Sequence, residues 1–245
     1  MAMPNAVPCD LMRAMAENPL QNVTFESNGS SAHGYLALPD SGRGPGLIVI
    51  QEWWGLVDHI ADVTNRFAAE GFVALAPDLY GGRTTHDAQE ASELMQQLPV
   101  EDAARDLAGA VDYLLSHDAV TSSTIGAVGF CMGGGFVLVL AAQQGDRIGA
   151  AVPFYGVPPA EPIDFSGLTA PVLGHYGERD GGIPPNTVTE LVDTVEQQSG
   201  QRPQVHMYPA GHAFLNDANP LGTHDAEQAD IAWRRTTEFL HRHLG

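Results

Sequence analysis

Lysine is absent from the chain, and basic residues are few. Eleven arginines stand against 30 aspartates and glutamates, which gives a formal net charge of -19. An acidic surface of this kind repels nucleic acid and anionic membranes, so neither is an expected partner. A saline habitat and a GC-rich genome each produce such a composition, and both explanations stay open.

Cysteine is also scarce, since only Cys9 and Cys131 are present. This excludes a disulfide framework and favours a reducing compartment. The chain has no apolar run approaching the roughly 20 residues that cross a bilayer. Its N-terminus lacks the basic segment and apolar core of a secretion signal. We therefore expect a cytoplasmic protein.

Short apolar runs predict a sheet that begins after a surface segment, residues 1–21, which carries prolines and has weak periodicity. The expected strands cover residues 22–25, 34–39, 47–50, 72–77, 125–130, 150–155, 171–177 and 204–208. The first two form an antiparallel hairpin at one sheet edge. The apolar run at 47–50 is typical of a parallel strand buried on both faces.

Segments with helical periodicity lie between these strands. The first predicted helix has Asp58 as its N-cap and ends at Gly71. The others cover residues 87–97, 101–116, the region after residue 131, and two segments around residues 188–195 and 229–244. This alternation predicts a single α/β domain, residues 1–245, with a mostly parallel, doubly wound sheet and helices on both faces.

One stretch has the pattern of a catalytic turn. The strand at 125–130 runs into Gly-x-Cys-x-Gly, centred on Cys131, and then directly into a dense apolar helix. This is the nucleophile elbow of the α/β-hydrolase fold, with a thiol as nucleophile. The glycines permit a strained turn, and the helix N-terminus favours thiolate over thiol. The alternative is a buried structural cysteine.

Two further residues complete a catalytic triad. α/β-Hydrolases place nucleophile, acid and histidine in that chain order, each after a strand. Cys131, Asp180 and His212 satisfy this order and lie among small residues. His212 is expected to take the thiol proton as a base and return it as an acid, while Asp180 fixes the imidazole tautomer.

Other polar residues have weaker claims. Asp78 also follows a strand, but a Pro-Asp pair there is more typical of a turn or cap than of the catalytic acid. His59 either lines the site or only occupies a helix face. Four more histidines are expected to be structural or solvated: His175, His206, His241 and His243. No set of residues has metal-ligand spacing, so we expect no metal and no cofactor.

Five motifs together resemble the dienelactone hydrolase family. They lie at residues 51–56, 76–80, 129–134, 176–180 and 210–214, and the resemblance runs from about Asn22 to the C-terminus. It implies hydrolysis of an enol-lactone or related ester through a Cys131 thioester. It also implies that Glu52 holds the resting thiol until substrate displaces it. An acid at the end of a buried strand is a candidate site residue in any case, although a plain surface glutamate is the alternative.

The resemblance extends to binding groups. The general pattern of the fold makes the backbone N–H of Met132 one oxyanion donor, and we assign Trp53 as the second. Arg83 matches a family arginine that binds a substrate carboxylate, with a solvated loop arginine as the alternative. Where the family type has a second arginine, after the catalytic histidine, this chain has Asn216, which we assign to substrate binding.

Aromatic residues complete the predicted substrate site. Trp54 and Phe214 lie within the motifs and are assigned to substrate binding, which favours a planar ligand, although Trp53 and Trp54 suit core packing equally well.

A generalist carboxylesterase or thioesterase is the second interpretation, and a non-catalytic thiol redox sensor or small-molecule binder is the third. An oriented base such as the Asp180 and His212 pair favours hydrolysis, because sensing does not require one. The exact substrate, and the choice between a monomer and a small homo-oligomer, stay open.

Overall fold

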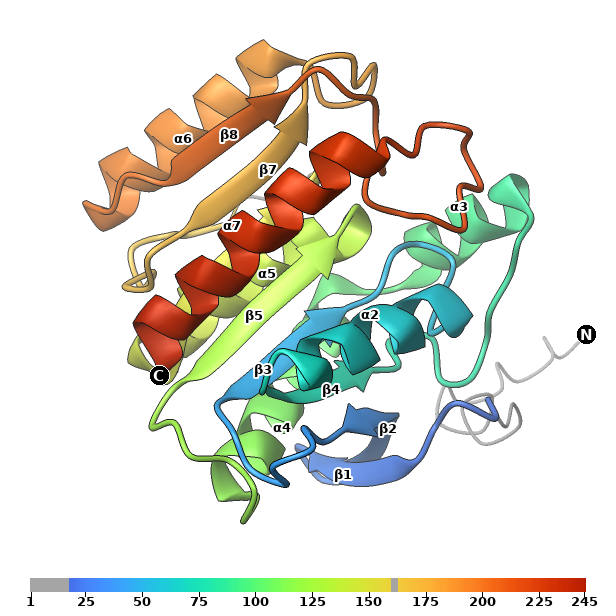
Figure 1. Cartoon of the computed structure of the whole chain (residues 1–245), viewed down its shortest axis with the longest axis vertical. Helices are drawn as coiled ribbons and strands as arrows, with labels where there is room; N and C mark the ends of the chain where they lie inside the picture. Colours follow the sequence, from blue (N-terminus) through green and yellow to red (C-terminus); the bar gives the residue numbers. More distant parts are fainter. Residues whose placement is uncertain (1–17, 160–162) are drawn as a thin grey trace, which may run out of the picture.

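The computed structural model describes residues 18–159 and 163–245. Its eight-stranded sheet has the order β1-β2-β4-β3-β5-β6-β7-β8 (Figure 1). The strands are β1 (Val23–Ser27), β2 (Ser30–Ala37), β3 (Gly46–Ile50), β4 (Val73–Pro77), β5 (Ile125–Phe130), β6 (Ile148–Phe154), β7 (Leu173–Gly177) and β8 (Gln204–Tyr208). β2 pairs antiparallel with β1 and β4, and the strands from β4 to β8 pair in parallel. The predicted hairpin and mostly parallel sheet are confirmed.

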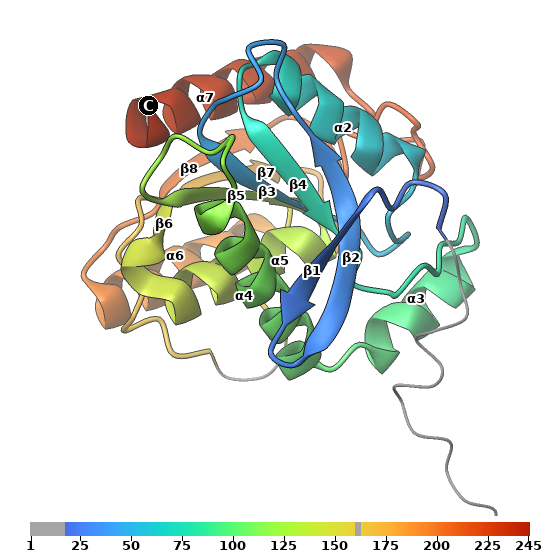
Figure 2. The same cartoon turned by 90° about the horizontal axis from the view of Figure 1, so that it is seen from below.

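Helices cover both faces of this sheet, as predicted. They are α2 (Asp58–Ala69), α3 (Ala88–Gln97), α4 (Val100–Ser116), α5 (Met132–Gln144), α6 (Pro185–Ser199) and α7 (Ala226–Leu244). Figure 2 shows α2 and α7 on one side of the sheet and α4, α5 and α6 on the other. Two large apolar clusters fill these two layers.

The burial of each element follows from its composition. Every residue of β3, β4 and β5 is buried, as expected of apolar parallel strands covered on both faces. α5 is apolar on nearly all sides and buries every residue from Gly133 to Ala142. It packs against β5, β6 and α4. The nucleophile elbow is thus anchored between the most deeply buried elements.

Two sequence predictions need a boundary correction. Val57, with extended backbone, is the N-cap of α2, and Asp58 is instead the first helical residue, with no capping hydrogen bond. Its charge still lies in the first turn, where the helix dipole favours an anion. β2 ends at Ala37, before Pro39, because proline cannot donate a ladder hydrogen bond. The surface segment predicted for residues 1–21, with Cys9, lies mostly outside the described residues.

The strand order reverses beside β3. From β3 the chain moves outward to β4, and it then crosses back to place β5 on the other side of β3. Loops that leave the carboxyl ends of two such strands diverge and leave room for a ligand. The loop after β3 carries Glu52 and Trp53, and the turn after β5 carries Cys131. Within the described ranges, no helix is long and apolar enough to cross a membrane.

Candidate active site

Cys131 occupies the sharp turn between β5 and α5. Its backbone has φ 52° and ψ -117°, a conformation that a non-glycine residue rarely adopts. Gly129 and Gly133 permit the turn, because a Cβ atom on Gly129 would collide with the carbonyl of Gly133, and one on Gly133 with the carbonyl of Ile50. The predicted elbow is therefore present, with a free, partly exposed thiol.

Asp180 and His212 meet at the same end of the sheet. His212 Nδ1 lies 2.6 Å from Asp180 Oδ2. The other carboxylate oxygen accepts the N–H groups of Gly182 at 2.9 Å and Ile183 at 3.1 Å. Burial acts to raise the pKa of Asp180, but its hydrogen bonds, chiefly the one from His212, outweigh burial and hold this pKa below its usual value. Asp180 is therefore a fixed negative charge that orients the imidazole.

His212 links this carboxylate to Cys131. Burial acts to lower the pKa of His212, but the hydrogen bonds to Asp180 and Cys131, and their negative charges, raise it from 6.5 to about 10. The imidazolium form is thus stabilised by the contacts of the ring with Asp180 and Cys131. The structure brings the three predicted triad residues together, from the loops after β5, β7 and β8.

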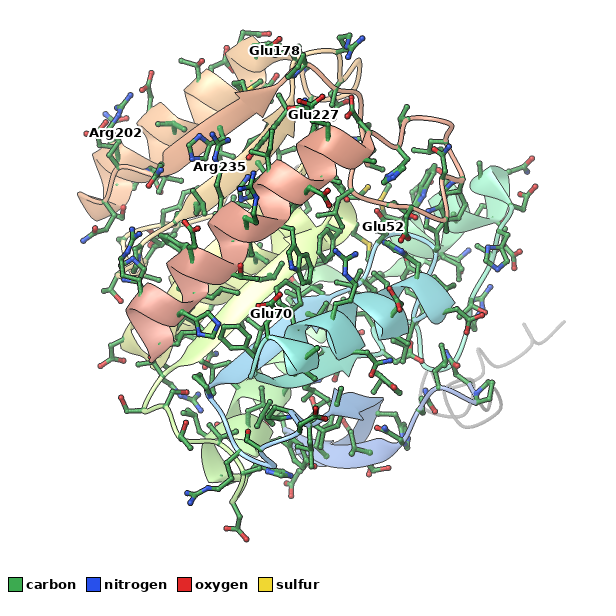
Figure 3. All side chains as sticks on the ribbon, in the orientation of Figure 1. Glu52, Glu70, Glu178, Arg202, Glu227 and Arg235 are labelled. Carbon is green, nitrogen blue, oxygen red and sulfur yellow. The ribbon has the colours of Figure 1, made fainter. Side chains whose placement is uncertain are left out.

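Glu52 is buried at the end of β3, with 1% of its surface exposed. Figure 3 labels it at the end of the sheet where the chain joins β8 to α7. Oε2 accepts a hydrogen bond from Asn216 Nδ2 at 2.6 Å, and Oε1 has no partner among the described residues. Burial raises the pKa of Glu52 to about 7, against the smaller opposing effects of Asn216 and His212. A plain surface glutamate is excluded.

Asn216 is not placed as a substrate ligand. Only 2% of its surface is exposed, and its amide nitrogen binds Glu52. The sequence predicts that Asn216 contacts the substrate. This prediction is corrected, because the amide nitrogen of Asn216 instead donates a hydrogen bond to the carboxylate of Glu52.

The predictions that Phe214 and Trp54 bind substrate also change. Phe214 is fully buried and packs between Tyr155 and Tyr208, with ring centroids 5.5 and 5.0 Å away. Trp54 is 5% exposed and meets the partly exposed Trp53 edge to face at 4.9 Å. Phe214 and Trp54 therefore belong to the core and have almost no surface for a substrate. The burial of large apolar rings explains the difference.

Two tyrosines were missed by the sequence analysis. Tyr155 follows β6 with φ 36°, lies edge to face with His212 at 5.3 Å, and has a buried hydroxyl without a partner in the described part of the chain. Burial, with the charges of Glu52 and Cys131, raises its pKa well above 10. Tyr80 donates its hydroxyl to Met132 Sδ at 3.3 Å. Both tyrosines follow parallel strands at the carboxyl edge of the sheet. This position was the only sequence signal that could have identified them as site residues.

The predicted oxyanion donors lie close together. Met132 begins α5 and Trp53 lies in the loop after β3, and both are partly exposed. These elements touch, because Gly133 abuts the carbonyls of Ile50 and Gln51. Neither N–H donates to another described residue. The donors therefore lie on adjoining elements, and their oxyanion role stays a prediction.

Arg83 is exposed at the edge of the site. Its carbonyl packs against Gly55, where an added Cβ would lie 2.6 Å away, so its loop borders the one that carries Glu52. Within the described ranges it forms no ion pair. Its carboxylate-binding role stays a prediction.

The alternative residues have structural partners. Asp78 accepts the N–H groups of Tyr80 and Gly82, at 3.0 and 2.9 Å, and so forms a turn. His59 pairs with Asp217 at 3.1 Å.

His175, on β7, is fully buried between Tyr208 and Thr236, at 2.7 and 3.0 Å, which confirms a structural role. No cluster of three potential metal ligands occurs in the described residues.

Known proteins share this arrangement of elements. Residues 32–244 match the dienelactone hydrolase family. Protein usf of Aquifex pyrophilus is 35% identical over 231 residues, 91% of this chain and 99% of the relative. A putative carboxymethylenebutenolidase of Aquifex aeolicus is 30% identical, also over 231 residues and with coverage of 91% and 99%.

A solved structure agrees with these sequence relatives. The putative dienelactone hydrolase from Klebsiella pneumoniae has a TM-score of 0.79 and 29% identity, covering 89% of this chain and 96% of that chain. The α/β-hydrolase fold predicted from the elbow is thereby confirmed, as is the family resemblance of the motifs. The chain is a hydrolase that belongs to the dienelactone hydrolase family.

Proposed function

We propose that the protein hydrolyses an enol-lactone or a related small carboxylic ester, with Cys131 as nucleophile and His212 and Asp180 as its proton-transfer pair. The observation that carries the proposal is the position of His212 between both partners: Nδ1 lies 2.6 Å from Asp180, and the ring also interacts with Cys131. A buried structural cysteine has no need of an oriented base.

The reaction follows from this geometry in two halves. His212 takes the thiol proton, and the sulfur attacks the substrate carbonyl. The N–H groups of Met132 and Trp53 stabilise the negative oxygen that forms. His212 then returns the proton to the leaving alkoxide or enolate, which leaves a thioester on Cys131. Water, deprotonated by His212, attacks the thioester and releases the acid, and the proton returns to the thiolate.

Glu52 is proposed to control the resting thiol. It is buried beside this machinery, interacts with the charge of His212, and has one carboxylate oxygen without a described partner. That oxygen is available to accept the thiol proton or its hydrogen bond when the site is empty. In this structure Cys131 interacts with His212 instead, as required of the reactive arrangement.

The substrate is proposed to be a small lactone or ester, in line with the name of the relative from Aquifex aeolicus, a putative carboxymethylenebutenolidase. Arg83, exposed beside the Glu52 loop, is the proposed carboxylate ligand. Asn216 is a neutral amide that donates to Glu52, so it adds no second charge for that carboxylate. Neutral esters are therefore expected to be accepted as well, which favours a broad esterase activity.

Turnover of an aryl ester and of a dienelactone tests this function. We expect Cys131→Ala to abolish activity, whereas Cys9→Ala stays near wild type and keeps its sensitivity to iodoacetamide. Full activity in the Cys131 variant would contradict the mechanism. If iodoacetamide labels Cys131 but no ester is turned over, the thiol serves sensing or binding and the proposed hydrolysis is wrong.

A further inference from the structure

Asn216 lies in a loop whose two successive side chains, Asn216 and Asp217, bind to other parts of the protein. The loop follows the catalytic histidine and includes Ala213, whose φ is 57°. Asn216 donates to Glu52, a residue 164 positions earlier in the chain, in a buried hydrogen bond of 2.6 Å. The next residue, Asp217, binds His59 of α2 at 3.1 Å. The loop therefore fixes Asn216 in place against the end of β3.

The surroundings of Glu52 are polar but poor in partners. Besides Glu52 Oε1, the Oδ1 atom of Asn216 and the hydroxyl of Tyr155 are buried without a partner among the described residues. The titratable groups that interact with Glu52 are Tyr155 after β6 and His212 after β8, and each of them also interacts with Cys131 at the start of α5. The next charged group of the loop, Asp217, pairs with His59 of α2. The direct partner of the carboxyl group is thus a neutral amide.

We propose that Asn216 is a positioning residue: it holds Glu52 beside the Cys131 site through a neutral donor, which leaves the carboxyl group able to gain and lose a proton while it stays in place. The inference rests on the proposed function, in which Cys131 is the nucleophile. It replaces the expected role of Asn216 as a substrate contact with a role in controlling the charge next to the thiol.

The physical reason is the difference between an amide and a cation. A guanidinium in contact with a buried carboxylate strongly favours its charged form. An amide donor favours it less, and burial of Glu52 then dominates and raises its pKa to about 7. Near neutral pH, Glu52 is therefore present in both forms. The protonated form adds no negative charge beside the thiolate or the developing oxyanion, whereas the ionised form opposes both.

The pH dependence of Cys131 alkylation by iodoacetamide tests this role, in a Cys9→Ala background so that one thiol reacts. We expect an inflection near pH 7 that Glu52→Gln removes. Asn216→Ala removes a donor to the carboxylate, so the inflection moves to higher pH by roughly half a unit or more. Asn216→Asp adds a like charge and moves it further in the same direction. Asn186→Ala, at an exposed asparagine of α6, serves as the matched control and leaves it in place.

Two results would overturn the inference. In the first, both Asn216 variants keep the wild-type inflection although Glu52→Gln removes it. In the second, the inflection survives in Glu52→Gln and so belongs to another group. Circular dichroism of each variant separates these results from misfolding. Alkylation does not require ester turnover, so a protein that proves not to hydrolyse esters still gives a decision on Asn216. The pH profile of kcat/KM provides the second readout.

Discussion

Asp180 and Glu52 are buried carboxylates at the same end of the sheet, 4% and 1% exposed. Burial acts to raise the pKa of both. Asp180 accepts hydrogen bonds from His212, Gly182 and Ile183, and its pKa lies below the usual value. Glu52 accepts one hydrogen bond, and its pKa rises to about 7. Similarly low exposure is thus accompanied by opposite shifts in pKa, because Asp180 has three donors, with the charge of His212 among them, where Glu52 has one amide donor.

The difference in pKa suits the two carboxyl groups to different roles in the site. A carboxylate that stays ionised can orient His212 and stabilise its charged form throughout the reaction. A carboxyl group that titrates near neutral pH can instead change its charge during a catalytic cycle. We therefore propose a constant electrostatic role for Asp180 and a variable one for Glu52.

Removal of the constant charge is expected to have the largest effect. Asp180→Asn leaves a neutral partner for His212 and favours the wrong tautomer, so kcat/KM for an aryl ester should fall on the order of a hundredfold or more. Asp118→Asn, at an exposed position, is the control. A loss of less than about threefold in Asp180→Asn would mean that a different group orients the imidazole.

The variable charge is expected to affect stability with a defined sign. The folded protein binds the Glu52 proton more tightly than the unfolded chain, so the free energy of unfolding falls as the pH rises from 4.5 to about 7. The full shift corresponds to about 3 kcal/mol. Urea denaturation between pH 5 and 7.5 should show that the free energy of unfolding of wild type declines relative to that of Glu52→Gln, but not relative to that of Glu227→Gln, an exposed control.

Asp180 provides a contrast, because its effect on the free energy of unfolding has the opposite sign and occurs in a different pH range. Its stabilising contribution is present above the usual aspartate pKa and is lost as the pH falls through the lower folded-state value. Between pH 5 and 7.5 it is therefore constant. A difference in the free energy of unfolding between wild type and Glu52→Gln that stays flat or rises over this range would contradict the assignment for Glu52.

The smallest expected effect concerns substrate charge. Arg83→Ala should lower the preference for a dienelactone over its methyl ester by about tenfold, since one exposed charge-assisted hydrogen bond is lost. The measurement is kcat/KM for both substrates, with Arg43→Ala, an exposed arginine of another loop, as the control. If the wild type strongly prefers the free acid and Arg83→Ala leaves that ratio unchanged, another residue binds the carboxylate.

The triad could be predicted because its signals are local. Gly129 and Gly133 mark the turn around Cys131, and Asp180 and His212 each follow an apolar strand in the expected order. Parallel strands bring their carboxyl ends to one edge of a sheet, so residues far apart in sequence converge there. The fold and the meeting of the triad therefore required only strand order.

The residues around Glu52 and the triad, such as Asn216 and Tyr155, could not be predicted from strand order. The bond between Asn216 and Glu52 spans 164 positions and depends on the path of one loop, which turns at Ala213 with positive φ. Tyr155 likewise points to the site because of its φ of 36°, where a continued strand was expected. Phe214 faces the core because the chain turns at Ala213, the residue before it. Non-glycine residues rarely adopt such conformations, so no sequence pattern indicated them.

The most direct test of the account is detection of the covalent intermediate. The protein is mixed with an aryl ester, quenched with acid during turnover, digested and analysed by mass spectrometry. The account predicts an acyl group on the peptide that contains Cys131, present in wild type and in Cys9→Ala and absent from Cys131→Ala. An acyl group on another residue, or ester turnover by Cys131→Ala at the wild-type rate, would contradict it.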